Sequence, residues 1–373
     1  MSQPENKHTI LIVDDTAGNI EVLSNTLRPE YHVRAAKNGV RALAIAQDTP
    51  PPDLILLDIM MPEMDGYETC KRLKDDASTA QIPVIFITAL SDEGDEEKGL
   101  ALGAVDYIAK PFKPVLVQAR VHNQLELKRH RDHLEVLVHE RTQELMLTQE
   151  ATIEAMAALA EYRDPETGGH IKRTQNYMKL LAEALKDHTR FSDYLDKETI
   201  HLLYLSAPLH DIGKVGISDN ILCKPAKLTD QEFEKMKEHT LFGRNTLLVA
   251  EEKLGGNSFL GFAREIAESH HERWDGRGYP HGIAGEAIPI CGRLMAVADV
   301  YDALISKRVY KPPFPHTKAV EIILQGKGTQ FDPDVIDAFQ ACSDKFLQIA
   351  LKYADHPEEI ATLSEKSHST QDE

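Results

Sequence analysis

Five short apolar runs alternate with helical patterns over the first third of the chain, and this alternation limits the possible folds more than any other feature. Strands that alternate with helices predict a parallel sheet covered by helices on both faces. The predicted strands are Thr9–Val13, His32–Ala35, Leu54–Leu57, Val84–Thr88 and Val105–Ile108. The predicted helices between them are Asn19–Leu27, Gly39–Gln47, Tyr67–Lys74 and Glu93–Leu102.

Composition restricts the class of protein. The 373 residues suggest two or three domains, and a hydrophobic content of 42% is ample for globular cores. A formal net charge of -18 argues against nucleic acid or an anionic membrane as a partner. No apolar run reaches the ~18 residues needed to span a bilayer, and the first eight residues lack a signal peptide's apolar region. Four scattered cysteines fit a reducing compartment. We therefore expect a cytoplasmic protein that binds neither nucleic acid nor a membrane.

Reactive side chains follow the predicted strands at their carboxyl ends, where parallel sheets bind ligands. Three carboxylates there can hold a hard cation such as Mg²⁺, and a hydroxyl and an ammonium can bind a phosphoryl group. Each residue alone is compatible with an ordinary loop, but all five in these places indicate one site. They are Asp14 and Asp15 after the first strand, Asp58 after the third, Thr88 closing the fourth and Lys110 after the fifth.

Residues 7–125 resemble the receiver domain of two-component response regulators, which has a doubly wound, CheY-like sheet of five parallel strands. The resemblance implies that Asp58 is the phospho-acceptor and that a sensor histidine kinase is a partner. The Mg²⁺ ligands that it implies are Asp14, Asp15, Asp58 and the carbonyl of Ile59. The switch residues that it implies are Thr88, Tyr107 and Lys110. We assign residues 1–125 to this domain.

A connector follows the receiver-like segment. Residues 114–163 contain no proline after Pro114 and no glycine, which permits one long helix or two nearly continuous ones. Side chains spaced 7, 4, 7 and 7 residues apart form a heptad seam, namely Leu127, Leu134, Val138, Leu145 and Thr152. Arg131 and Arg141 fall on the same seam and weaken it. We interpret residues 126–150 as a connector helix that pairs in a homodimer; the alternative is a linker helix packed against its own domains.

The strand pattern ends after the connector, and amphipathic runs at helical spacing take its place. We expect an all-α domain over residues 151–350 and a polar, disordered tail over residues 351–373. The predicted helices are Ile171–Lys186, Ile200–Leu209, Asp230–Val249, Phe262–His271, Arg293–Ile305, His316–Leu324 and Pro333–Ala341.

Metal-ligand residue types recur on these helices. Glu166 and His170 are four residues apart, so on a helical turn they can face one ion. In the adjacent pair His210-Asp211, the carboxylate is the natural bridge between two metals. Further candidates are His239, the adjacent pair His270 and His271, and Asp299. Adjacent side chains on a helix point about 100° apart, so the pair can serve two neighbouring ions. A lone helical histidine is usually solvated, but imidazoles and carboxylates on five segments suit Fe, Mn, Ni, Co or Zn.

Three stretches make the resemblance of this second part specific: Arg163–His170, His210–Lys214 and His270–Pro280, the last containing Gly278-Tyr279-Pro280. They resemble the HD-GYP family of HD phosphohydrolases, metal-dependent phosphodiesterases that hydrolyse the bacterial second messenger cyclic di-GMP. The resemblance implies two or three divalent ions, with iron first and Mn, Ni or Co as alternatives, and Glu166 favours three. The ligands that it implies are Glu166, His170, His210, Asp211, His239, His270, His271 and Asp299.

The same resemblance implies a phosphorylation-regulated hydrolase that attacks the phosphodiester with a metal-bound hydroxide and releases pGpG, GMP or both. Asp211 and Lys214 are the expected catalytic residues, with Lys214 also at the substrate phosphate. The other expected substrate contacts are Tyr279, Arg308 and Lys311, of which the last two could instead form a solvated basic loop. Asp302 lies on the same helix face as Asp299 and could orient a ligand histidine. Two alternatives stay open: an enzyme that prefers pGpG, and a phospho-regulated interaction module with incidental catalysis.

Overall fold

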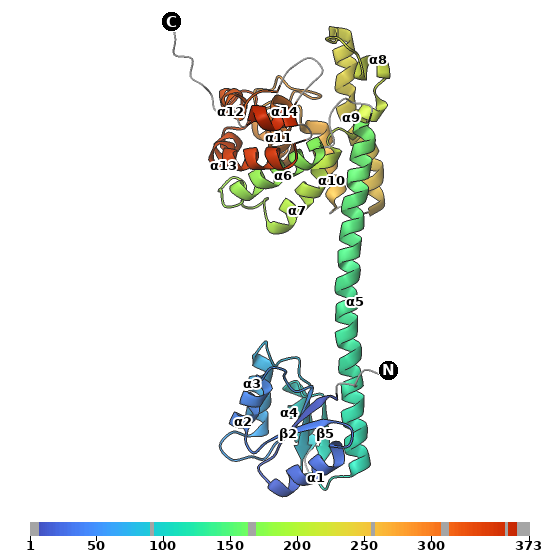
Figure 1. Ribbon diagram of the computed structural model, residues 1–373, viewed down its shortest axis with the longest axis vertical. Coiled ribbons are helices and arrows are strands. Elements are labelled where there is room, and N and C mark those ends of the chain that lie inside the picture. The colour runs from blue at the N-terminus through green and yellow to red at the C-terminus, as the bar shows by residue number, and fades with distance from the viewer. Residues whose placement is uncertain are drawn as a thin grey trace. The chain divides into compact units, whose positions relative to one another are not determined.

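The computed structural model describes residues 7–89, 93–162, 169–254, 258–306, 313–354 and 357–363, with backbone only for residues 93–96 and for Leu254. The chain divides into two compact units, Met1–Gln143 and Glu144–Glu373. The labelled strands in Figure 1 belong to the first unit, whereas the second is drawn with helices. Within the described ranges, no helix has the length and apolarity that crossing a membrane requires.

A five-stranded parallel sheet in the order β2-β1-β3-β4-β5 forms the centre of the first unit, and the predicted fold class is confirmed. The strands are β1 (Thr9–Val13), β2 (His32–Ala36), β3 (Leu54–Asp58), β4 (Val84–Thr88) and β5 (Asp106–Ala109). In the register, Val13 of β1 pairs with Leu57 of β3, and Thr88 of β4 pairs with Ala109 of β5. The residues that follow these strands therefore emerge along one edge of the sheet, where the reactive side chains were predicted.

The central strands β1, β3 and β4 bury both of their faces, since successive side chains point to opposite sides, whereas the edge strands β2 and β5 are partly exposed. Ile10 and Ile12 pack on one side with Leu27 and with Val117 of the following long helix. Leu11 packs on the other side in a separate cluster. The helices of this unit are α1 (Ala17–Leu27), α2 (Gly39–Ala46), α3 (Gly66–Asp75) and α4 (Glu93–Ala101). Continuous apolar strands are what a sheet covered on both faces requires.

The connector is one continuous helix of 48 residues, α5 (Pro114–Glu161), rather than two (Figure 1). Its first turns complete the core of the first unit, and Ile153 near its end packs in a cluster of the second unit. The four apolar seam side chains are more than half exposed: Leu127 61%, Leu134 57%, Val138 64% and Leu145 70%. Exposed aliphatic side chains at heptad spacing are the surface on which a coiled coil forms.

The regular elements in the described part of the second unit are helices, apart from an isolated bridge between Lys327 and Phe331. Its α-helices are α6 (Gly169–Leu185), α7 (Lys197–Ser206), α8 (Asp219–Leu222), α9 (Asp230–Leu254), α10 (Phe259–Ser269), α11 (Ile290–Ile305), α12 (His316–Gln325), α13 (Pro333–Lys352) and α14 (Pro357–Leu363). Short 3-10 turns lie at η1 (Ala207–Leu209), η2 (Ile212–Gly216) and η3 (Gly285–Ala287). The predicted all-α class is therefore confirmed.

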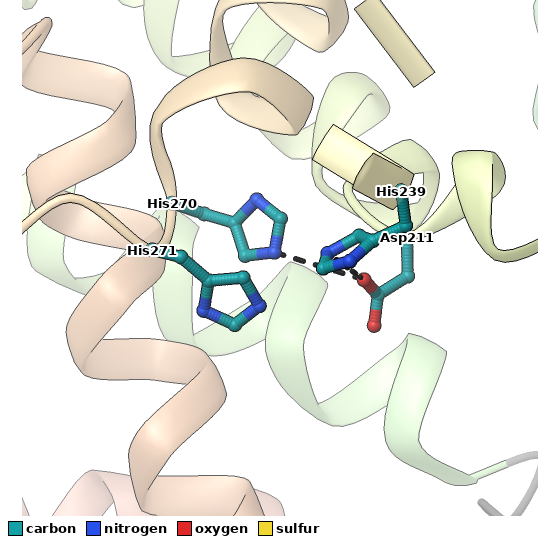
Figure 2. A group of neighbouring side chains, drawn as sticks. All are labelled: Asp211, His239, His270 and His271. Carbon is teal, nitrogen blue, oxygen red and sulfur yellow. Dashed lines mark ion pairs between the residues drawn. The ribbon is translucent and has the colours of Figure 1, made fainter. Parts of the chain in front are cut away.

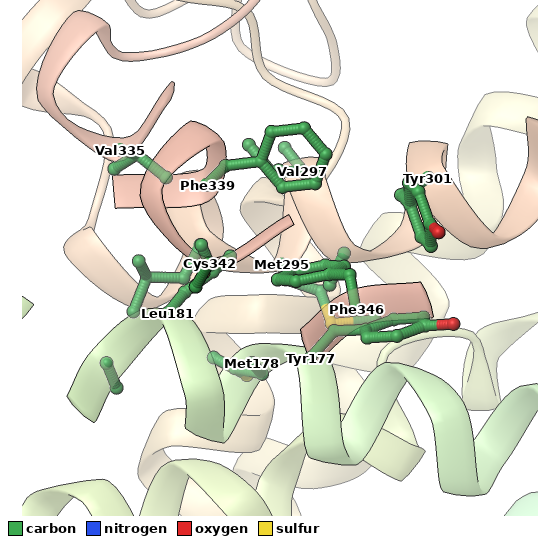
Figure 3. Packing of buried hydrophobic residues seen from close by; sticks show 14 of the residues in the cluster. Tyr177, Met178, Leu181, Met295, Val297, Tyr301, Val335, Phe339, Cys342 and Phe346 are labelled. Atoms are coloured by element: carbon green, nitrogen blue, oxygen red, sulfur yellow. The ribbon is translucent and has the colours of Figure 1, made fainter. Parts of the chain in front are cut away.

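Aromatic packing holds α6, α11 and α13 together (Figure 3). Tyr177 and Phe346 stack with ring centroids 4.5 Å apart, and Tyr301 meets Phe346 edge-on at 5.1 Å. Such pairs add about 0.5–1.5 kcal/mol to the burial of their area. All three rings are fully buried, so α6 and α11 are fixed relative to each other. These two helices also carry candidate ligands, His170 on α6 and Asp299 on α11.

A short helix in the tail and the end of the helix before His271 differ from the prediction. The tail after residue 351 was expected to be disordered, but Pro357–Leu363 forms α14, which buries Glu359 and Leu363 on one side. Two buried residues four positions apart give too weak a periodic signal to predict a helix. The helix expected to end at His271 ends at Ser269, with His270 as its C-cap. The 100° spacing of adjacent helical side chains therefore does not apply to His270 and His271.

Candidate metal centre

Four side chains from three segments form a first cluster: Asp211, His239, His270 and His271, whose ligand atoms lie within 4.8 Å of one another. Oδ1 of Asp211 lies 3.3 Å from Nε2 of His239 and 3.6 Å from Nε2 of His270. Figure 2 shows these two contacts, with His271 beside His270. The rings of His270 and His271 have centroids 4.0 Å apart. His270 and His271 therefore lie in the same cluster, rather than one in each of two clusters.

A second cluster contains His170, His210 and Asp299, again with ligand atoms within 4.8 Å of one another. The Nε2 atoms of His170 and His210 are 3.4 Å apart, and Oδ1 of Asp299 lies 4.0 Å from Nε2 of His210. His170 stands at the start of α6, His210 follows η1, and Asp299 lies on α11. Three segments far apart in the sequence thus converge on this cluster.

Asp211 joins the two clusters. Its Oδ1 faces His239 and His270, whereas its Oδ2 lies 3.2 Å from Nε2 of His210 in the second cluster. Nζ of Lys214 also lies 2.7 Å from Oδ2. One carboxylate with its two oxygens turned to two groups of donors has the geometry of a bridging ligand.

Main-chain carbonyls fix three of the imidazoles. Nδ1 of His210 lies 3.0 Å from the Ala207 carbonyl, and Nδ1 of His270 lies 2.9 Å from the Ile266 carbonyl. His239 contacts the Met236 carbonyl in the same way, at 2.7 Å. A carbonyl can only accept, so the Nδ1 atom of each neutral ring carries the proton and Nε2 presents a lone pair.

These lone pairs test whether the residues fit metal ions. Oδ1 of Asp211 and the Nε2 atoms of His239 and His270 are buried, and none has a hydrogen bond within the part of the chain that the structure describes. Buried acceptors that face one another are costly without a positive partner. A divalent cation accepts electron pairs from all three atoms, and mixed imidazole and carboxylate donors suit the transition metals. The donor set therefore fits.

The protonation states of Asp211, His239 and His271 agree with this fit; burial would lower the pKa of His210, but Asp211 raises it. Burial alone would raise the pKa of Asp211, but Lys214 and His210 hold it well below its usual range. Burial lowers the pKa of His239 to about 4 and that of His271 well below its ordinary value. At neutral pH the carboxylate is charged and these two rings are neutral, which are the forms that bind metals.

Asp302 positions His170. Its Oδ2 lies 2.8 Å from Nδ1 of His170, and its Oδ1 accepts a hydrogen bond of 2.6 Å from Nε of Arg173. Burial would raise the pKa of Asp302, yet Arg173 and His170 hold it well below its usual range. The structure thus places Asp302 where the sequence suggested, as the acceptor that turns Nε2 of His170 to the second cluster. Arg173 was missed, although it follows His170 by three residues on the same helix.

Two glycines allow the segments to approach. A side chain on Gly213 would meet the carbonyl of His239 at 1.9 Å, so glycine lets η2 lie against α9 beside that ligand. A side chain on Gly278 would meet the carbonyl of His271 at 2.6 Å. The backbone N–H of Tyr279 donates to that same carbonyl at 3.2 Å. The loop after the paired histidines is therefore folded back onto them.

A cleft of about 310 Å³ borders the first cluster, with His270 and His271 in its wall. Tyr279, an expected substrate contact, lines it with its ring centroid 4.7 Å from that of His271. Lys237, which sequence reasoning missed, lines it too, with Nζ 5.6 Å from the Tyr279 ring centroid. Arg273, which pairs with Asp275, and Arg277 are also in the lining with one carboxylate, Glu272, so basic side chains outnumber acidic ones in the wall. The expected residues Glu166, Arg308 and Lys311 lie outside the described residues.

The receiver residues also converge. Asp14, Asp15 and Asp58 form a group within 4.8 Å, and Nζ of Lys110 lies 3.0 Å from both Asp14 and Asp58. Burial raises the pKa of Asp58, although Lys110 opposes the shift. Asp15 is exposed, so the group is open to solvent on one side.

The remaining receiver residues lie beside this group. The Ile59 carbonyl, an expected Mg²⁺ ligand, accepts a hydrogen bond of 2.9 Å from Gly66 and retains one lone pair. Thr88 and Tyr107 line one small pocket together, as a coupled pair of switch residues would. The Arg120 guanidinium lies 5.2 Å from the Tyr107 ring centroid.

Comparison with known proteins supports both units. The family model of the response regulator receiver domain matches residues 10–122, and that of the HD domain matches residues 154–335. The HD domain implies binding of divalent metal ions, for which the two clusters are the candidates.

Three relatives combine long coverage with clear identity. A Vibrio cholerae protein named "Probable cyclic di-GMP phosphodiesterase" is 50% identical over 93% of this chain and 80% of its own. The "Cyclic di-GMP phosphodiesterase response regulator RpfG" of Xanthomonas campestris is 35% identical over 88% of this chain and 86% of its own. A "Cyclic di-GMP phosphodiesterase" of Thermotoga maritima is 34% identical over 89% of each chain. This chain belongs to the family of response regulators that join a receiver domain to an HD domain of the HD-GYP type.

Proposed function

We propose that the chain is a phosphorylation-regulated phosphodiesterase that hydrolyses cyclic di-GMP to pGpG, GMP or both. The observation that carries this proposal is the position of Asp211, whose two oxygens face two separate groups of donors. Two adjacent cations suit phosphodiester hydrolysis, since they can stabilise the attacking oxygen and neutralise the charge of another. The three named relatives support the choice of substrate.

We further propose which residues hold the ions. The first cluster and the second share Asp211, and Glu166 is the expected ligand of a third ion. The ligands would be Glu166, His170, His210, Asp211, His239, His270, His271 and Asp299. The family resemblance makes iron our first choice for these positions, with Mn, Ni or Co as alternatives. Imidazole and carboxylate donors without cysteine are compatible with all four metals. Mg²⁺ is our choice for Asp14, Asp15, Asp58 and the Ile59 carbonyl in the receiver.

The protein's own groups prepare the reaction. When bound, the ions would supply Lewis acidity and lower the pKa of a water molecule towards ~7. Lys214 lies against Asp211 and holds positive charge where a phosphate oxygen would approach. Tyr279 and the basic wall of the cleft would bind the nucleotide beside the first cluster. Arg308 and Lys311 are proposed to bind the second phosphate, for which a guanidinium is well suited.

The proposal extends to regulation. A sensor histidine kinase would phosphorylate Asp58, beside which Lys110 supplies a positive charge for the phosphoryl oxygens. The exposed seam of α5 would pair with a second copy in a homodimer. We assign residues 1–125 to the receiver, 126–150 to the connector and 151–350 to the HD domain, and α5 runs through all three.

Turnover by purified protein tests the proposal. The protein is loaded with Fe²⁺ or Mn²⁺ under anaerobic conditions and given cyclic di-GMP or pGpG in separate reactions. Faster loss of cyclic di-GMP is expected. Faster loss of pGpG would reassign the main substrate. Turnover of neither nucleotide with any metal would contradict an enzymatic role and favour an interaction module.

A further inference from the structure

The last residue of the connector helix lies at the metal centre. Glu161 ends α5, and its side chain is 5% exposed. Its Oε1 is 3.9 Å from Nε2 of His170. This is the ring nitrogen that also faces His210 in the second cluster, at 3.4 Å. The connector therefore brings a buried carboxylate to a candidate ligand.

The hydrogen bonds of His170 determine what Glu161 meets. The Nδ1 atom of His170 is 2.8 Å from Asp302, a carboxylate that Arg173 keeps ionised. In the neutral ring the proton is therefore on Nδ1, and Nε2 offers a lone pair. A carboxylate oxygen and an imidazole lone pair that face each other in a buried site attract a cation.

The spacing allows one ion to contact both atoms. Transition-metal bonds to imidazole nitrogen and carboxylate oxygen are about 2.0–2.2 Å long, so two donors to one ion lie at most about 4.4 Å apart. The 3.9 Å between Glu161 and His170 falls within that limit. It also resembles the 4.0 Å between Asp299 and His210, two members of the second cluster.

We propose that Glu161 and His170 share a divalent cation, so that the connector helix itself supplies a ligand to the metal centre. This inference rests on the proposed metal-dependent function. It gives α5 a second role besides joining the two units. A displacement of the helix end would move a ligand directly, without passing through the core of the HD domain.

Metal binding tests the inference without relying on turnover. Glu161→Gln removes the negative charge and keeps the shape of the side chain. Mn²⁺ is added to metal-free full-length protein, and bound ions are counted by equilibrium dialysis with elemental analysis and by electron paramagnetic resonance. We expect one class of sites to bind about tenfold more weakly or to be lost, because ligand-orienting and ligand carboxylates contribute that much or more to affinity. An unchanged number of ions with unchanged affinity would overturn the proposal.

Glu154→Gln is the matched control. Glu154 lies seven residues earlier on α5, on the same helix face, and pairs with Lys172 rather than with a candidate ligand. The Glu154→Gln variant removes the same charge from the same helix without removing a proposed ligand. Its Mn²⁺ binding curve should therefore match that of the wild type. An equal loss in both variants would mean that helix charge, rather than a shared ion, is responsible, and would overturn the proposal.

Coupling to His170 gives a second criterion. If the two residues share an ion, Glu161→Gln should weaken binding no further in a His170→Ala background. Full additivity of the two losses would contradict a shared ion. Should Glu161→Gln fail to fold by circular dichroism, Glu161→Asp replaces it, because it keeps the charge and withdraws the carboxylate by one methylene. The same weakening is then expected, and wild-type affinity would overturn the proposal.

The outcomes separate this inference from the function on which it rests. Wild-type protein that binds its ions but turns over no nucleotide would refute the proposed function and leave the Glu161 result intact. Active wild-type protein with an unaffected Glu161→Gln variant would refute only the present inference.

Discussion

At the residue scale, the candidate ligands could be found because their types are rare together and their spacing is regular. His210-Asp211 and His270-His271 stand out as adjacent pairs, and Asp299 stands out as an acid in an apolar run. Arg173, Lys237 and Glu161 could not be found in this way. Charged residues of these kinds are ordinary on exposed helix faces, and only the packing of α5, α6 and α9 brings them to the site. The sequence shows which residues can bind a metal. The residues that position these ligands are brought to them by tertiary contacts, which the sequence does not show.

Asp302→Asn tests whether Asp302 orients the His170 ring for metal binding. The amide keeps the size of the side chain but loses the charge that pairs with buried Arg173. We expect affinity at the second cluster to fall about 10–100-fold and the melting temperature to drop, since Arg173 is left as an uncompensated buried charge. Metal titration followed by calorimetry measures both effects. Asp344→Asn, at an exposed position on α13, is the control. Unchanged metal affinity in Asp302→Asn would contradict the positioning role.

His316, which is not one of the candidate metal ligands, should make the stability of the second unit depend on pH. It is 8% exposed, its Nδ1 lies 2.8 Å from the Tyr301 hydroxyl oxygen, and burial lowers its pKa. Because its pKa is lower in the folded state, the unfolded state binds more protons below the ordinary value of ~6.5. Its contribution to stability is complete above that pH and is lost as the pH falls.

The melting temperature of metal-free protein should therefore fall more for the wild type than for His316→Gln between pH 7.5 and pH 5.5. Thermal unfolding followed by circular dichroism at both pH values measures the difference. Parallel falls in the two proteins would show that His316 titrates normally in the fold.

At the scale of elements, periodicity predicted the five strands to within one residue at either end, because most of them are short apolar runs between turn residues. The helices were predicted with less accurate ends. α13 runs to Lys352, well past the predicted end at Ala341, and α14 was not expected. Where a helix stops depends on its last contacts, and the buried Leu363 shows that α14 packs on its neighbours. Local sequence contains little of that information.

The seam of α5 yields a prediction for association. Leu134 and Val138 are more than half exposed and lie on the heptad seam. Leu134→Lys or Val138→Lys should weaken the dimer at least about tenfold, because each change removes a large apolar contact from both copies. Sedimentation equilibrium over a range of concentrations measures this. Val136→Lys changes a side chain that is 56% exposed on the same helix but off the seam, and it should have little effect. Equal weakening by all three would argue against a specific seam.

At the scale of the whole molecule, one chain combines a candidate phosphoryl-acceptor site with a candidate metal centre, and α5 runs from one unit into the other. The sequence predicted this order of domains because the strand pattern ends before the connector begins. It could not predict that the connector would reach His170 through Glu161, since that contact requires the folded HD domain. Signalling by phosphorylation would then act through a helix that ends beside a ligand.

Asp58→Asn tests this link. An acyl phosphate should change the cyclic di-GMP turnover of the wild type at least about fivefold, in line with ordinary coupling between sites, and should leave Asp58→Asn unchanged. Turnover is measured before and after treatment at constant metal content. Asp75→Asn, at an exposed position on α3, should respond as the wild type does. An identical response of the wild type and Asp58→Asn would show that Asp58 does not control the enzyme.

The central claim is that Asp211 joins two groups of ligands into one hydrolytic metal centre. One anaerobic preparation each of wild type and Asp211→Asn, analysed for bound metal and for nucleotide product, tests it most directly. We predict at least two divalent ions per wild-type chain with release of pGpG or GMP from cyclic di-GMP. The variant should keep its helical circular dichroism, lose bound metal and lose at least about 1,000-fold in turnover, since the ions supply several kcal/mol of the catalysis. A folded Asp211→Asn protein that keeps its metal and its turnover would contradict the claim.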